Sequence, residues 1–152
     1  MSTEIRAARA ADCARLTEIA IAAKRHWGYP AAWIDGWRDD LTFTRDKLAS
    51  WDVFCAVEGG AVLGVGALSC DGEAEVEGLW VWPAAMGRGI GRLLLKRLVA
   101  QARARGMSQL RIVSDPNALG FYRRNGAQVV GSLPSTPAGR TLPLCYLDCS
   151  PP

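Results

Sequence analysis

A glycine-rich loop between an apolar strand and a long amphipathic helix constrains this chain more than any other feature. The strand stops at Pro83, glycines alternate at Gly87, Gly89 and Gly91, and a helix begins within the loop. The first N–H groups of a helix have no intrahelical acceptor, and the helix dipole attracts anions to that end. Glycine lets an anion approach the backbone without a Cβ in the way. An ordinary strand-to-helix turn is the alternative, but three alternating glycines ahead of a long helix favour a phosphate cradle.

The spacing of these glycines limits which phosphate ligand fits. A dinucleotide-binding Gly-x-Gly-x-x-Gly fingerprint that starts at Gly87 requires a glycine at position 92, which is Arg92. The loop also follows a hairpin meander past the middle of the chain rather than an opening β-α-β unit. The nucleotide-triphosphate pattern Gly-x-x-x-x-Gly-Lys-Ser/Thr does not occur. The sequence therefore predicts a pyrophosphate-containing ligand of another kind, to which Arg88 and Arg92 add positive charge.

Hydrophobic periodicity along the rest of the chain predicts one α/β (α+β) domain over residues 1–152. Early helices precede an antiparallel meander and then a β-α-β-α-β-β order. The expected architecture is a mixed, mostly antiparallel central sheet of about seven strands flanked by about four helices. Strands are expected at 4–8, 53–57, 62–69, 74–82, 110–113, 128–133 and 142–149, and helices from 12 onward and at 30–41, 44–48, 89–105 and 117–124.

Composition and charge exclude several classes of protein. The 18 Lys and Arg residues against 15 Asp and Glu give a net charge of +3, too small an excess to indicate a nucleic-acid partner. No apolar stretch approaches the roughly 20 residues that span a bilayer, and the polar N-terminus lacks the apolar core of a signal peptide. We therefore expect a cytoplasmic protein with no membrane partner. Five scattered cysteines and the single histidine, His26, indicate free thiols and no metal site.

Two segments resemble motifs of the GNAT superfamily of N-acetyltransferases. Residues 81–94, V-x-P-x-x-x-G-R-G-I-G-x-x-L, resemble its acetyl-CoA-binding motif, and residues 115–127, D-P-N-A-x-x-F-Y-x-x-x-G-A, resemble its second motif. Both occur in the expected order, so the resemblance covers essentially the whole chain. Met86 stands where the family motif has Gln or Arg, which costs little if that position acts through its backbone N–H. Residues 24–29, K-x-H-W-G-Y, together with residues 139–143, G-R-x-L-P, are similar to a bacterial branch of the superfamily with unassigned substrates.

The resemblance implies a GNAT fold that binds acetyl-CoA (coenzyme A) as co-substrate and transfers acetyl to a primary amine by direct attack. Asn117 is expected to meet the pantetheine arm, and the strand before the loop to pair with its amides as an added strand would. The expected cofactor contacts are Leu79, Trp80, Val81, Met86, Gly87, Arg88, Gly89, Ile90, Gly91, Arg92, Asn117, Phe121 and Tyr122. The amine belongs to a small molecule or a peptide. A non-catalytic CoA-binding regulatory or sensor module is the alternative, and an exposed edge strand near the C-terminus permits a homodimer.

Acetyl transfer also requires a neutral amine and a proton for the departing thiolate. Glu75 and Glu77 lie two residues apart on the strand, so both should point to one face, and the resemblance implies that a glutamate here is the base. Two solvated carboxylates are the alternative. Tyr122 has a phenolic proton and, by resemblance, occupies the position that protonates the thiolate. Its alternative is a tyrosine that only packs beneath the helix.

Aromatic side chains crowd the predicted helical hairpin near the N-terminus, namely His26, Trp27, Tyr29, Trp33 and Trp37. Beside Asp35 and Asp39, such a group has the chemistry to hold a cationic amine. The first three residues of the set, His26, Trp27 and Tyr29, are therefore predicted to bind the acceptor. Packing of the tryptophans in an ordinary core is the alternative.

Overall fold

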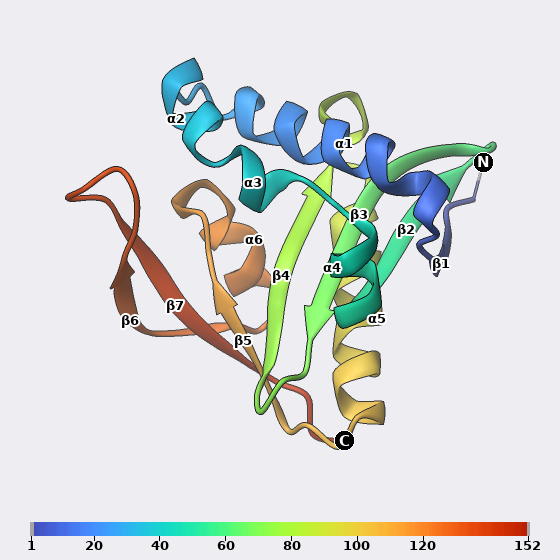
Figure 1. Cartoon of the computed structure of the whole chain (residues 1–152). Helices are drawn as coiled ribbons and strands as arrows, with labels where there is room; N and C mark the ends of the chain where they lie inside the picture. Colours follow the sequence, from blue (N-terminus) through green and yellow to red (C-terminus); the bar gives the residue numbers. More distant parts are fainter. Residues whose placement is uncertain (1, 152) are drawn as a thin grey trace.

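Seven strands form one sheet in the order β1-β2-β3-β4-β5-β7-β6 in the computed structural model, which describes residues 2–151 (Figure 1). All neighbouring strands are antiparallel except β4 and β5, which are parallel. This arrangement confirms the predicted mixed, mostly antiparallel sheet. The strands are β1 (Glu4–Ala7), β2 (Asp52–Glu58), β3 (Ala61–Ser69), β4 (Ala74–Val81), β5 (Gln109–Val113), β6 (Gln128–Pro134) and β7 (Thr141–Asp148).

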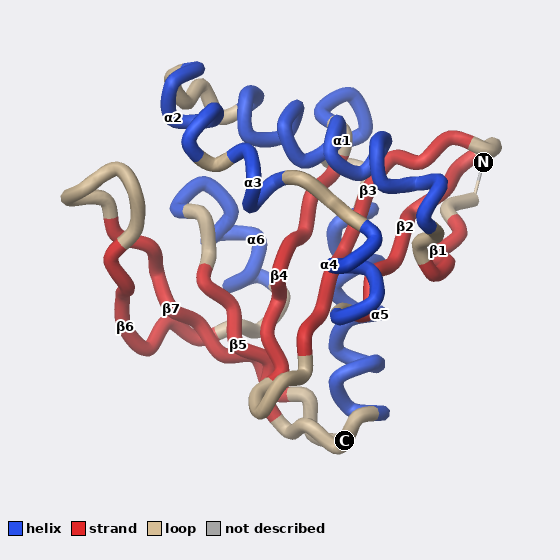
Figure 2. The backbone as a smooth tube through the Cα atoms, viewed as in Figure 1, coloured by secondary structure: helices blue, strands red, loops and turns tan. Residues whose placement is uncertain are grey.

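Helices cover both faces of the sheet, with α1 on one side of β2–β4 and α5 on the other (Figure 2). The predicted helix over 30–41 is two short helices that meet at Trp37, so the described residues hold six α-helices where five helical segments were expected. None of these helices is both long and apolar enough to cross a membrane. The helices are α1 (Cys13–His26), α2 (Ala31–Gly36), α3 (Arg38–Leu41), α4 (Arg45–Ser50), α5 (Ile90–Ala104) and α6 (Leu119–Arg124), with 3₁₀ turns at Ala10–Asp12, Pro83–Ala85 and Pro116–Ala118.

Alternation along the central strands divides the core in two. On β2, Val53 and Cys55 pack in the cluster under α1, whereas Phe54 and Ala56 pack in the cluster under α5. Successive side chains of a strand point to opposite faces, so a continuous apolar run is buried on both sides. The two helical layers are therefore held in place by the same few strands.

The parallel contact between β4 and β5 is short. Ala74 pairs with Leu110 and Glu75 pairs with Arg111, and the two strands then diverge (Figure 1). On its other side, β4 stays paired with β3 up to Val81, with a bulge where Ala67 opposes Gly78 and Leu68 opposes Val76. The edge of β4 that faces β5 is thus free of strand partners over the half that leads into the glycine-rich loop.

Close packing of α5 on β3 depends on a glycine. A Cβ added at Gly64 would lie 3.0 Å from Ile90 Cγ2, 3.0 Å from Leu94 Cδ1 and 3.3 Å from the Trp80 carbonyl oxygen. Ile90 and Leu94 are both buried side chains of the first turns of α5. The glycine therefore sets how closely the N-terminal half of α5 approaches the sheet.

Replacement of Gly64 by alanine should destabilise the fold, because the added methyl group pushes the start of α5 away from β3. We expect Gly64→Ala to lower the free energy of unfolding by about 1–3 kcal/mol in urea denaturation. Gly131→Ala on β6 is the matched control, because nothing lies within 4 Å of its added Cβ. Equal unfolding free energies for Gly64→Ala and the unmodified protein would contradict this account of the packing.

Candidate functional site

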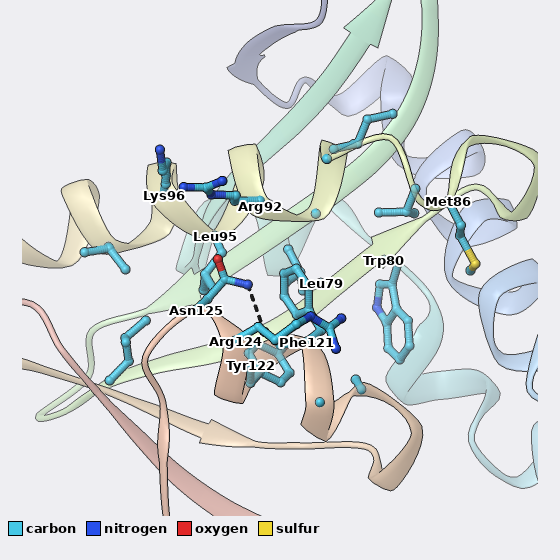
Figure 3. Close-up of a pocket in the computed structure, with 18 of the residues that line it drawn as sticks. Leu79, Trp80, Met86, Arg92, Leu95, Lys96, Phe121, Tyr122, Arg124 and Asn125 are labelled. Carbon is cyan, nitrogen blue, oxygen red and sulfur yellow. Dashed lines mark hydrogen bonds between the residues drawn. The ribbon is translucent and has the colours of Figure 1, made fainter.

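A cavity of about 1240 Å³ opens where β4 and β5 diverge, between β4, the start of α5, and α6 (Figure 3). The structure brings every predicted cofactor residue except Arg88 to its wall. Across the described residues, no cluster of three His, Cys, Asp or Glu side chains has metal-site geometry. The predicted residues that line the cavity are Leu79, Trp80, Val81, Met86, Gly87, Gly89, Ile90, Gly91, Arg92, Asn117, Phe121 and Tyr122.

The glycine-rich loop uses left-handed backbone at two positions. Gly87 has φ = 80° and Gly89 has φ = 82°, and Gly89 is the N-cap of α5. Residues with a Cβ rarely adopt this conformation, which explains both glycines. The first three N–H groups of α5 have no acceptor within the helix. They belong to Ile90, Gly91 and Arg92, which line the cavity. This end of the helix therefore has the chemistry of an anion site.

The third glycine of the loop has a different role. A Cβ at Gly91 would lie 3.3 Å from Phe121 Cε1 and 3.4 Å from its Cζ, so Gly91 lets the Phe121 ring pack against α5. Asn125 Nδ2 donates a 2.8 Å hydrogen bond to the Phe121 carbonyl oxygen, drawn as a dashed line in Figure 3. Helix α6 is thereby fixed close to the helix that begins at the loop.

Basic side chains gather on the same wall. Arg92 and Lys96 project from α5 and Arg124 from α6 (Figure 3). Arg88 does not join them, because its guanidinium pairs with the Glu58 carboxylate outside the cavity lining. Sequence reasoning missed Lys96 and Arg124. Lys96 lies four residues after Arg92, so helical periodicity places it on the same face, whereas nothing in the sequence distinguishes Arg124 from its neighbour.

Tyr122 lies in the wall of the cavity with 5% of its surface exposed. Burial raises the pKa of its phenol well above the ordinary value, so the hydroxyl stays protonated at neutral pH. Tyr122 therefore places a protonated phenol in the wall of the cavity.

The two predicted bases lie on β4 but do not line the cavity. Glu75 accepts a 3.0 Å hydrogen bond from Arg111 Nη1. Burial, followed by the charge of Glu77, raises the pKa of the Glu75 carboxyl. Glu77 is exposed and accepts a 2.7 Å hydrogen bond from Ser69 Oγ. The β4 bulge interrupts the alternation from which a shared face was predicted. A base role for either residue stays a prediction.

Near the predicted acceptor side, a polar cluster joins α1, the α1–α2 loop and the segment after β5. Asp115 accepts hydrogen bonds from Lys24 Nζ at 2.6 Å and from the Tyr29 hydroxyl at 3.0 Å. Asn117 Nδ2 donates to the Tyr29 hydroxyl at 3.1 Å. Burial opposes ionisation of Asp115, but hydrogen bonds, led by that of Lys24, hold its carboxyl pKa below the usual value. Burial likewise lowers the pKa of Lys24.

The three predicted acceptor residues are placed differently. Trp27 lines the cavity and is 37% exposed. His26 packs edge-on against Trp27 outside the lining, and Tyr29 belongs to the polar cluster. Asp35, expected beside the aromatic side chains to hold a cation, instead pairs with Arg38 on the surface.

Comparisons with known proteins agree with this geometry. A family model for the acetyltransferase (GNAT) family matches residues 12–127. An IAA acetyltransferase of Azospirillum brasilense is 40% identical over 73 residues, which cover 44% of this chain and 48% of that protein. The chain spans between 27% and 48% of the length of the curated relatives that it matches.

Solved structures share the whole fold. A GCN5-related N-acetyltransferase from Rhodopseudomonas palustris superposes with a TM-score of 0.85 at 20% identity and covers 97% of this chain and 96% of its own. The protein yncA of Salmonella typhimurium, solved with its cofactor acetyl-CoA, has a TM-score of 0.70 at 25% identity. The match covers 100% of this chain and 96% of yncA. Because the family model matches residues 12–127, which is most of the chain, the chain belongs to the acetyltransferase (GNAT) family.

Proposed function

We propose that the protein is an N-acetyltransferase that moves acetyl from acetyl-CoA to a primary amine. The observation that carries the proposal is the cavity itself, in which a helix N-terminus, basic side chains and a protonated tyrosine share one wall. The N–H groups at the start of α5, together with Arg92, Lys96 and Arg124, suit the phosphates of CoA. The unpaired edge of β4 at Leu79–Val81 suits the amides of its pantetheine arm.

In this proposal acetyl-CoA supplies a thioester, the neutral amine nitrogen bonds to its carbonyl carbon, and the carbon–sulfur bond breaks. The amine loses one proton and the departing thiolate gains one, so no covalent acyl-enzyme is needed. Tyr122 is the proposed donor to the thiolate, because it lines the cavity and its phenol is protonated. Glu75 is the proposed base, and since it lies outside the cavity wall it acts through water.

The names of the curated relatives do not agree on an acceptor. One rice relative is a serotonin N-acetyltransferase and another is a glucosamine 6-phosphate N-acetyltransferase. A screen of CoA release from acetyl-CoA over a library of primary amines tests the proposed activity directly. Binding of CoA without turnover of any amine would favour the non-catalytic CoA-binding module instead.

Removal of the Tyr122 hydroxyl should slow acetyl transfer while acetyl-CoA affinity is retained. We expect Tyr122→Phe to reduce the pre-steady-state rate of transfer roughly 100-fold, the usual effect of a positioned acid. Pre-steady-state measurement is needed because product release can limit turnover. Tyr146→Phe on β7 is the control, since Tyr146 lies outside this cavity. A near-normal rate for Tyr122→Phe would mean that water protonates the thiolate.

Two arginines of the glycine-rich loop should differ in their effect on CoA binding. We expect Arg92→Gln to raise the dissociation constant of CoA and to weaken its dependence on salt, because Arg92 lines the cavity. Arg88→Gln should change neither quantity appreciably, because that side chain pairs with Glu58. Calorimetry at low and moderate ionic strength measures both. A larger loss of affinity in Arg88→Gln than in Arg92→Gln would refute this assignment.

The proposed base predicts a particular pH profile. A carboxylate base loses activity as pH falls through its pKa, and a raised pKa moves this acidic limb toward neutral pH. We therefore expect Glu75→Gln to remove the acidic limb of kcat/KM, because burial raises the pKa of the Glu75 carboxyl. Glu77→Gln should leave the limb in place, because Glu77 is exposed and bonded to Ser69. An unchanged limb in both variants would assign it to ionisation of the amine substrate.

A further inference from the structure

Two buried cations share one carboxylate beside the cavity. Lys24 Nζ lies 2.6 Å and Arg140 Nη2 lies 3.5 Å from Asp115 Oδ2. The three side chains are 10%, 12% and 6% exposed, respectively. They come from α1, from the loop before β7 and from the loop after β5, so the fold assembles them from three distant segments.

Two of the aromatic side chains in the predicted acceptor region, Tyr29 and Trp37, are already covered by these two cations. Lys24 Nζ lies 4.7 Å from the ring centroid of Trp37 and 5.2 Å from that of Tyr29. Arg140 Cζ lies 4.6 Å and 5.0 Å from the same two centroids. Both ring systems thus make their cation–π contacts within the chain. A positively charged group of an acceptor would meet repulsion there instead of an open aromatic cage.

The charges of this cluster do not cancel. Lys24 and Arg140 both face Asp115, and the Tyr29 hydroxyl bonds with Asp115 and Arg140. Two cations against one carboxylate leave an excess of one positive charge among largely buried groups. Burial of an uncompensated charge is costly, so such a cluster has a strong preference for an added anion.

Arg140 has hydrogen-bonding capacity to spare. Its Nη2 donates to the Tyr29 hydroxyl at 2.9 Å and faces Asp115, and its Nη1 makes only a long 3.4 Å contact with Ser135 Oγ. A guanidinium carries five N–H donors in a planar fork that matches carboxylate and phosphate oxygens. The Tyr29 hydroxyl already donates to Asp115 and accepts from Asn117, so it does not compete for an added oxyanion.

The cluster adjoins the proposed site of acetyl transfer. Asp115 and Asn117 belong both to the cluster and to the cavity wall. The Trp80 ring projects from β4 at the cavity (Figure 3), and its centroid lies 5.3 Å from Lys24 Nζ. Lys24 and Arg140 do not themselves line the cavity, but these shared residues place both cations directly behind its wall.

Resting on the proposed acetyl transfer, we propose that the acceptor is an amine that also bears an oxyanion, a carboxylate or a phosphate. Arg140 binds the oxyanion through its free N–H donors, Lys24 supplies the second positive charge, and the amine of the same molecule points past Trp80 into the cavity. The transfer is unchanged: the amine nitrogen bonds to the acetyl carbon, the carbon–sulfur bond breaks, and one proton passes from the amine to the departing thiol.

Matched amines that differ only in the acid group test this inference. Rates of CoA release would be compared for L-amino acids against the amines that remain after removal of the carboxyl group, and for O-phosphoethanolamine against ethanolamine. In the carboxylate pairs, the phosphate pair or both, we expect kcat/KM to be roughly tenfold or more higher for the amine that bears the acid group. This factor is the usual value of a charge-assisted hydrogen bond. The pair type that discriminates identifies carboxylate or phosphate as the oxyanion.

The variants Arg140→Gln and Arg140→Lys show whether Arg140 is responsible. Arg140→Gln should abolish the discrimination, mainly by raising KM, while acetyl-CoA binding is kept, and Arg140→Lys should restore part of it. Arg45→Gln, an exposed arginine on α4, is the matched control and should behave as the unmodified protein. Equal or better turnover of the amines without an acid group would overturn the inference and leave the proposed acetyl transfer intact.

A binding measurement separates failure of this inference from failure of the proposed function. Calorimetry with the same amino acids and O-phosphoethanolamine, in the presence of CoA, does not depend on turnover. Binding that is lost in Arg140→Gln but retained in Arg45→Gln would support the oxyanion site. If acetyl-CoA also released no CoA with these ligands in the turnover assay, acetyl transfer would be refuted. Equal binding of these ligands by Arg140→Gln and the unmodified protein would refute the oxyanion site.

Discussion

The short parallel contact between β4 and β5 is the constraint on which the rest of the structure depends. Backbone N–H and C=O groups inside a sheet normally find partners, and an unpaired buried group is costly. Here one edge of β4 has no strand partner beyond Glu75, although the strand lies in the middle of the sheet. The chain thereby keeps an internal sheet edge available, with helix α6 beside the gap.

The walls of that gap are held by close contacts at glycine. Gly64 lets the start of α5 lie against β3, and Gly91 lets the ring of Phe121 lie against α5. These two contacts hold the N-terminus of α5 and helix α6 next to the same strand. The N-terminal end of one helix and the tyrosine of the other are consequently presented to a single space.

The sequence predicted those features that depend on neighbouring residues. The period of the apolar residues located all seven strands, and the Gly87–Gly91 spacing located the loop and helix start that line the cavity, because turn geometry and helix ends are local properties. Features that depend on distant pairs were missed. Arg88 pairs with Glu58, 30 residues away, and Lys24 pairs with Asp115, 91 residues away. Neither partner is recognisable without the folded arrangement.

The carboxylate of Asp115 lies at a boundary between two regions that the chain builds separately. On one side it holds Lys24 and Tyr29, and through Oδ1 it accepts the backbone N–H of Asn117 at 2.8 Å, at the start of the segment that carries α6. Any ligand that shifts this wall from one side alters what is presented on the other. Two ligands that each displace this carboxylate would have thermodynamically linked affinities, and the linkage would be reciprocal.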